Sequence, residues 1–240
     1  MNSRTARTFT PALLLLFTLA ALSTHADAPQ TPEEHFDFAM KLLKADEPLD
    51  MEGAMEHLRA AAEKEYRSAQ RVLGKLYLDR FENSAATEDA EQARQWLEKA
   101  AKKGDARAQE YLGSMYEQGL GLEQDYMRAA EWYRKSADAG YGRAQVSLAF
   151  AYYAGRGVEK DMVEALCWFE SAAAQGHSAA QLTLGIMLRD GDGVEKDYPT
   201  ALHWFLHDAA PHESIHAQAL ALIQTESDLK YRKKYAGVWK

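Results

Sequence analysis

The sequence predicts an all-α protein, an α/α right-handed superhelical solenoid of helix-turn-helix repeats with a 36-residue period. The first observation behind this prediction is a tryptophan repeated at that period, namely Trp96, Trp132, Trp168 and Trp204. The second is an Ala-Gln pair that recurs at the same interval. The third is the spacing of apolar residues by three and four positions, which is typical of helices with one buried face. A single helix pair cannot bury its own apolar face, so the pairs must stack on one another.

Each repeat is predicted to contain two helices, here called helix A and helix B. In the third repeat, the apolar spacing predicts helix A over 141–154 and helix B over 161–175. Between them, Gly155-Arg156-Gly157 has the backbone freedom that a tight turn needs. Asp161 and Glu164 have the spacing of a capping box, so we expect helix B to begin there.

Both ends of the repeat array depart from this pattern. The first repeat has three extra residues and lacks the Gly-x-Gly, carrying Glu82-Asn83-Ser84-Ala85 in that region, so we expect a longer interhelix loop. Upstream, His57 replaces the tryptophan in a degenerate helix B, and residues 33–45 form a preceding helix. Downstream, Pro211 interrupts the pattern and residues 217–223 form a last helix. Terminal units that differ from the consensus are typical of the caps of a solenoid.

These observations predict seven segments. In chain order they are a signal peptide at 1–26, degenerate capping helices at 27–66, four repeats at 67–104, 105–140, 141–176 and 177–212, and a C-terminal capping helix with a basic tail at 213–240.

The first 26 residues have the three-part layout of a secretory signal peptide. Arg4 and Arg7 precede an apolar run over 12–22, and small residues follow it up to Ala26, where we expect cleavage. The run is about half the ~20 residues that a membrane-spanning helix needs. We therefore expect a protein secreted into the bacterial periplasm with no transmembrane span after cleavage; an uncleaved signal anchor is the alternative.

Composition excludes several classes of protein. With 47% hydrophobic and 27% charged residues, the chain is not disordered as a whole. Its net charge of −8 argues against nucleic-acid binding, which depends on surplus Lys and Arg. The one cysteine, Cys167, allows neither an internal disulfide nor a cysteine-based zinc site. We expect Cys167 to be at least partly exposed on helix B, where a link to another chain is an alternative to a tolerated small residue.

The repeat motif resembles a known family. The pattern Ala-x-x-Leu-Gly-x-x-Tyr-x-x-Gly-x-Gly-Val-x-x-Asp, followed by Ala, Trp, a small pair and a closing Gly, is similar to the Sel1-like repeat, a relative of the tetratricopeptide repeat. The second, third and fourth copies match it almost position for position. This resemblance implies a scaffold that brings other proteins together, in bacteria often in envelope assembly, secretion, signalling or host contact.

Helix A residues that vary between copies are the candidates for recognition. At ~100° per residue, Val146 and its neighbours at i+4 and i+7 face away from the packing stripe that contains Leu148. The expected apolar groove consists of Val146, Phe150, Tyr153, Leu182 and Ile186, flanked by Arg143, Arg189 and Asp190. Such a patch predicts a site for a protein or peptide partner, whose identity the sequence leaves open. The alternative is ordinary core, covered by the superhelical twist or by residues 224–240.

A histidine-rich segment is the one feature that suggests an enzyme. His212 and His216 match the H-E-x-x-H pattern of zinc peptidases, and His203 and His207 have the same spacing. No third ligand is evident, and a zinc peptidase needs one together with an open coordination position. We therefore expect no catalytic residue and no cofactor. A metal-binding protein or a zinc-dependent envelope hydrolase that uses these four histidines is the alternative.

Overall fold

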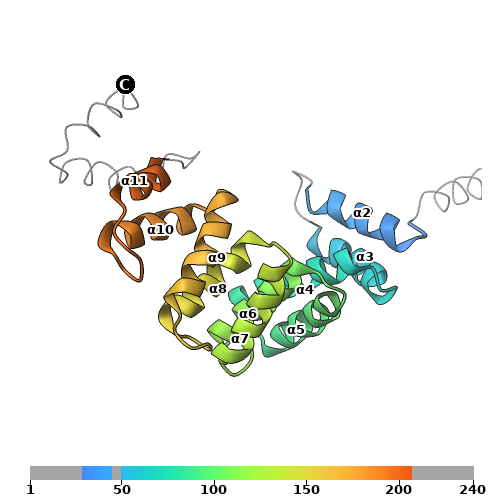
Figure 1. Ribbon diagram of the computed structural model, residues 1–240. Coiled ribbons are helices and arrows are strands. Elements are labelled where there is room, and N and C mark those ends of the chain that lie inside the picture. The colour runs from blue at the N-terminus through green and yellow to red at the C-terminus, as the bar shows by residue number, and fades with distance from the viewer. Residues whose placement is uncertain (1–28, 45–49, 207–240) are drawn as a thin grey trace, which may run out of the picture. The chain divides into compact units, whose positions relative to one another are not determined.

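The computed structural model describes residues 29–44 and 50–206, and that part of the chain is entirely helical (Figure 1). The chain forms two compact units, residues 1–69 and 70–240. The helices are α2 (Pro32–Leu42), α3 (Met51–Glu63), α4 (Arg67–Ser84), α5 (Thr87–Lys102), α6 (Ala106–Gln118), α7 (Tyr126–Asp138), α8 (Gly142–Ala154), α9 (Met162–Ala174), α10 (Ser178–Asp190) and α11 (Tyr198–Leu206). The predicted signal peptide and the helix expected at 217–223 lie outside the described residues. The predicted all-α repeat fold is confirmed.

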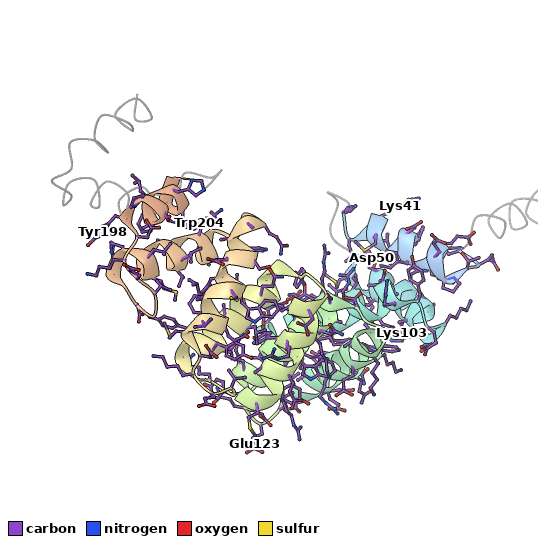
Figure 2. The ribbon with its side chains drawn as sticks, viewed as in Figure 1. Lys41, Asp50, Lys103, Glu123, Tyr198 and Trp204 are labelled. Carbon is purple, nitrogen blue, oxygen red and sulfur yellow. The ribbon has the colours of Figure 1, made fainter. Side chains whose placement is uncertain are left out.

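The first unit contains the hairpin formed by α2 and α3 (Figure 1). Thr31 and Glu34 form a capping box at the start of α2, which confirms the degenerate helix expected from the sequence. Asp50, labelled in Figure 2, caps α3 by accepting a hydrogen bond from the amide of Gly53. One face of α3 is fully buried, and it consists of Ala54, Met55, Leu58, Ala61 and Ala62.

The second unit repeats one helix pair, seen as α6–α7, α8–α9 and α10–α11 (Figure 1). Helices α8 and α9 begin and end within one residue of the predicted bounds. Helix α8 ends because Gly155 adopts a left-handed conformation, with φ of 68°, and its amide donates to the carbonyl of Ala151. Asp161 caps α9 by accepting hydrogen bonds from the amides of Val163 and Glu164. Figure 2 shows Glu123 in the corresponding loop between α6 and α7.

The first repeat differs from the sequence-based expectation. The extra residues do not lengthen the loop; they extend α4 to Ser84, so that only Ala85 and Ala86 separate it from α5. Without the Gly-x-Gly, residues 82–84 contain no glycine to adopt a left-handed conformation, and the helix continues. It ends where Ala85 itself takes a positive φ of 55°. The expected longer loop is therefore wrong.

The core of each repeat centres on the residue that follows the tryptophan. Tyr133, Phe169 and Phe205 are almost completely buried, and Leu97 occupies the same position in the first repeat. Trp168 is only partly buried, but it packs against the clusters on both sides of α8, as expected for a residue between units. The repeated tryptophan is evident from the sequence, whereas the more deeply buried ring one residue later was not predicted.

These rings need a small residue on the facing helix A. A Cβ atom added at Gly113 would lie 2.5 Å from Cε1 of Tyr133, and one added at Gly185 would overlap the ring of Phe205. The third repeat has Ala149 at the equivalent position, and it belongs to the same core cluster as Phe169. Small residues at this position therefore allow the paired helices to approach closely.

None of the helices in the described part of the chain is both long and apolar enough to cross a membrane.

The end of α4 generates a stability prediction. Substituting Ala85→Gly should raise the free energy of unfolding by about 0.5–1 kcal/mol, because glycine adopts a positive φ without the steric penalty of a Cβ atom. Urea denaturation of the two proteins measures this difference. The matched control is Ala86→Gly, whose φ of −73° suits alanine and which should bring no gain. Equal effects of the two substitutions would contradict the argument.

The close approach of α6 and α7 generates a second prediction. Substituting Gly113→Ala should lower the free energy of unfolding by about 1 kcal/mol, because the clash with Tyr133 outweighs the better helix propensity of alanine. The Tyr133 ring cannot easily turn away, since its hydroxyl donates to Glu117. Thermal or urea denaturation tests this, with Gly185→Ala against Phe205 as a second instance. A stabilised Gly113→Ala variant would show that the helices separate without cost.

Candidate functional site

The candidate recognition residues lie on two A helices. Arg143, Val146, Phe150 and Tyr153 are on α8, and Leu182, Ile186 and Arg189 are on α10. Phe150 is the exposed apolar residue of this set, with 40% of its surface accessible, and the other four apolar residues are partly buried. The candidate surface therefore has its most accessible apolar group on α8.

Packing separates the apolar residues into two groups. Val146 and Tyr153 pack against the core cluster that contains Phe169 of α9 and Leu184 of α10. Leu182 and Ile186, in contrast, pack against a cluster on α11 that consists of Ala201, Leu202 and Phe205. Figure 2 labels Tyr198 at the start of α11 and Trp204 near its end. The structure therefore brings Val146, Phe150 and Tyr153 together on α8, and it places Leu182 and Ile186 toward α11. We call the first group, with Arg143, the α8 surface.

Phe150 is held in place on its inner side. Its ring meets that of the fully buried Phe169 edge to face, with centroids 4.9 Å apart and an interplanar angle of 81°. This edge-to-face arrangement is favourable for aromatic pairs and stabilises the ring on its inner side. The rest of the Phe150 ring remains in contact with solvent.

Tyr153 forms the polar end of the α8 surface. Its hydroxyl donates a hydrogen bond of 2.5 Å to Oδ2 of Asp192, in the loop between α10 and α11, and Lys160 lies 5.8 Å from the centre of its ring. The hydrogen bond to Asp192 raises the pKa of Tyr153. Nearby, Arg189 pairs with Asp190 and lowers the pKa of that carboxyl group. At this end, Arg189 is therefore paired with Asp190, and Asp192 accepts a hydrogen bond from the third repeat.

The other end of the α8 surface adjoins a buried carboxylate. Arg143 is 62% exposed, and its Nε lies 3.8 Å from Oε1 of Glu110, whose side chain is only 7% exposed. Burial raises the pKa of Glu110, although Arg143 and Lys75 oppose that shift. The second oxygen, Oε2, is buried without a hydrogen-bond partner among the described residues. An unsatisfied buried acceptor of this kind costs about 1–3 kcal/mol.

The helix A positions that form the α8 surface in the third repeat make up a row that recurs in every repeat. In the first two repeats, this row carries charged residues that are paired with other residues of the chain. In the first repeat, Nε of Arg71 lies 3.3 Å from Oδ2 of Asp105, and Lys75 forms an ion pair with Asp79. In the second, Glu117 accepts a hydrogen bond of 2.7 Å from the Tyr133 hydroxyl. Burial and this bond raise the pKa of Tyr133. The row therefore changes along the chain from mainly charged and polar residues in the first two repeats to mainly apolar residues in the third and fourth.

The burial of Glu110 was not predicted, because this row of helix A was expected to face away from the packing stripe. A signal was present, because the equivalent positions of the third and fourth repeats carry the apolar residues Val146 and Leu182. A carboxylate at a position that other copies fill with aliphatic side chains is a candidate for a buried charge.

A shallow pocket of about 370 Å³ lies away from the α8 surface, between α5 and the loop over 122–125. Its arginines are already paired, Arg94 with Glu91 and Glu98, and Arg128 with Asp125. The pocket therefore offers no surplus positive charge to an anionic ligand.

The metal-binding alternative falls largely outside the described residues. His203 is exposed on α11, whereas His207, His212 and His216 lie beyond the described part of the chain. Within residues 29–44 and 50–206, no three His, Cys, Asp or Glu side chains are grouped so that they could hold a metal ion. Cys167 is exposed on α9 with a free thiol, as expected.

Comparison with known proteins identifies the repeat. The family model of the Sel1 repeat matches residues 67–105, 106–141, 142–177 and 178–206. Among solved structures, the chain is similar to c5321, a protective antigen of uropathogenic Escherichia coli with an SLR fold, at 27% identity and a TM-score of 0.66, covering 87% of this chain and 49% of that one. A Sel1 repeat protein from Oxalobacter formigenes is 32% identical with a TM-score of 0.63, over 72% of this chain and 68% of that one.

The chain thus spans about half the length of the c5321 chain. No curated protein matches the sequence.

The buried carboxylate generates a prediction on pH dependence. A raised pKa means that the folded protein holds the Glu110 proton more tightly than the unfolded chain does, so stability is lost as the pH rises through that raised pKa. Glu110→Gln should therefore be more stable than the wild type at pH 8, by on the order of 1 kcal/mol. The difference should shrink as the pH falls toward 4.5.

Urea denaturation across this pH range measures the effect, and Glu123→Gln in the exposed α6–α7 loop serves as the control. A wild type that is more stable than Glu110→Gln at pH 8 would mean that the ion pair with Arg143 outweighs the cost of burial.

Proposed function

Because the chain belongs to the Sel1 repeat family, whose members are generally protein–protein interaction scaffolds, we propose that it is a non-enzymatic adaptor that binds a partner through the α8 surface. The partner is a protein or peptide segment. Secretion into the periplasm is part of this proposal, and it is supported by the signal-peptide layout of residues 1–26.

The observation that carries the proposal is the exposure of Phe150. A large aromatic side chain that is exposed but already stabilised on its inner side loses less conformational entropy on binding. Aromatic residues of this kind supply much of the binding energy at protein interfaces. The edge-to-face contact with Phe169 provides that stabilisation.

The surroundings of Phe150 indicate what the partner must present. Val146 and Tyr153 extend the apolar contact along α8, one turn to either side. Arg143 lies at the start of the same helix, and 62% of its side chain is exposed. A helix or extended segment with an apolar anchor and a nearby carboxylate would complement this row.

Substitution at Phe150 tests the proposal. Phe150→Asp should weaken partner binding about 30-fold or more, as expected for a central aromatic residue. The partner is first identified by placing a photo-crosslinking amino acid at position 150 of the full chain in the host cell. Its affinity for the purified wild type and variant is then measured by calorimetry.

Val163→Asp is the matched control, because Val163 is an apolar residue on α9 that is 67% exposed and lies outside the α8 surface. The control should retain full affinity. A partner that crosslinks equally from position 163, or that binds Phe150→Asp as tightly as the wild type, would place recognition elsewhere. Circular dichroism of both variants should show an unchanged helical signal.

A further inference from the structure

Two histidines meet in the N-terminal hairpin. His35 on α2 and His57 on α3 bring their Nδ1 atoms within 2.9 Å of each other, and both side chains are partly buried. The centroids of the two rings are 5.1 Å apart. This separation is close to the sum of the distance between the two Nδ1 atoms and the distance from each Nδ1 to the centre of its own ring. The two nitrogen atoms therefore point at one another. The contact is therefore a head-on hydrogen bond between imidazoles.

Such a bond depends on how many protons the pair holds. In the neutral pair, one ring donates its Nδ1–H and the other accepts with its Nδ1 lone pair. A first added proton goes to the free Nε2 of the donor ring, which leaves the bond in place and makes it charge-assisted. A second added proton must bind to Nδ1 of the acceptor ring. Two N–H groups and two positive charges then face each other. The bond is lost at that step.

The surroundings disfavour a positive charge on His35, so we assign the acceptor role and the second proton to this ring. Burial lowers the pKa of His35, and the neighbouring His57 and Lys64 lower it further. Lys64 follows α3 and donates to the carbonyl of Gln30. Glu34 on α2 acts in the opposite direction, but its carboxylate already accepts hydrogen bonds from the amides of Gln30 and Thr31.

The apolar side of the pair is closed by Phe38. Its ring packs 4.6 Å from that of His57, centroid to centroid.

Since the lowered pKa of His35 favours the neutral form in the folded state, the stability that it contributes is present at neutral pH and is lost as the pH falls through that lowered value.

We propose that His35 and His57 form an acid-sensitive latch, which holds α2 against α3 at neutral pH and releases it when both imidazoles are protonated. The latch is independent of partner binding at the α8 surface. Its effect is confined to the hairpin, because both residues and their charged neighbours belong to α2, α3 and the residues directly flanking them.

The repeat itself provides the matched variant. His57 occupies the position that tryptophan holds in all four repeats, so His57→Trp replaces the titrating ring with the consensus residue. His35→Gln is the second variant. A glutamine amide can donate to a neutral His57 or accept from a protonated one, so this bond should survive acid.

Hydrogen exchange followed by mass spectrometry tests the latch in the full chain between pH 7.5 and 4.5. Protection factors, corrected for the intrinsic rate, should fall for α2 relative to α8 by up to about tenfold per pH unit once the second proton binds. Both variants should lose this dependence. The amides of α8 provide the internal reference, because they contain no part of the pair.

NMR titration of the imidazole nitrogens provides an independent readout. Replacing His57 by tryptophan should raise the pKa of His35, because the neighbouring imidazole lowers it in the wild type. A His35 titration that is the same in the wild type and in His57→Trp would overturn the proposal. So would α2 protection that does not change with pH, or that falls equally in the wild type and both variants.

Discussion

The packing of one aromatic ring against one small residue is the constraint on which the repeat array depends. Tyr133 lies against Gly113, and Phe205 lies against Gly185. This contact sets the distance between helix A and helix B, because a bulky side chain on the helix A residue would force the ring away. The tryptophan one position earlier in the sequence then packs between neighbouring pairs, as Trp168 does. Two adjacent residues of helix B therefore determine the spacing within a repeat and the contact to the next.

Because the packing face of helix A is determined in this way, its other face is free to vary between copies. One position carries Arg71, Glu110, Val146 and Leu182 in successive repeats. The structure gives these residues different surroundings: Arg71 forms an ion pair, Glu110 is buried, and the two aliphatic residues pack against separate clusters. Recognition by a repeat protein depends on such divergence, since the residues shared by all copies serve the fold.

The N-terminal hairpin shows what happens where the consensus is lost. Without the tryptophan, α3 presents His57, which forms a polar contact with His35 in place of aromatic packing. Aromatic packing depends little on pH, whereas a hydrogen bond between two imidazoles depends on their protonation. Similarly, α4 lacks the glycines that end the later A helices, and it continues to Ser84. Each departure from the repeat has a local physical consequence.

The sequence by itself determined the period, the helix pairs, the cap at Asp161 and the exposure of Cys167, because these follow from backbone hydrogen bonding and from which residues recur every 36 positions. Tertiary structure decided which side chains of one face are buried. Leu182 and Phe150 occupy the same predicted face of helix A, yet Leu182 packs toward α11 and Phe150 stays exposed. Glu110 is buried for the same reason. The burial of a side chain at the margin of a helix face depends on the neighbouring helix that reaches it, and periodicity within one helix contains no information about that neighbour.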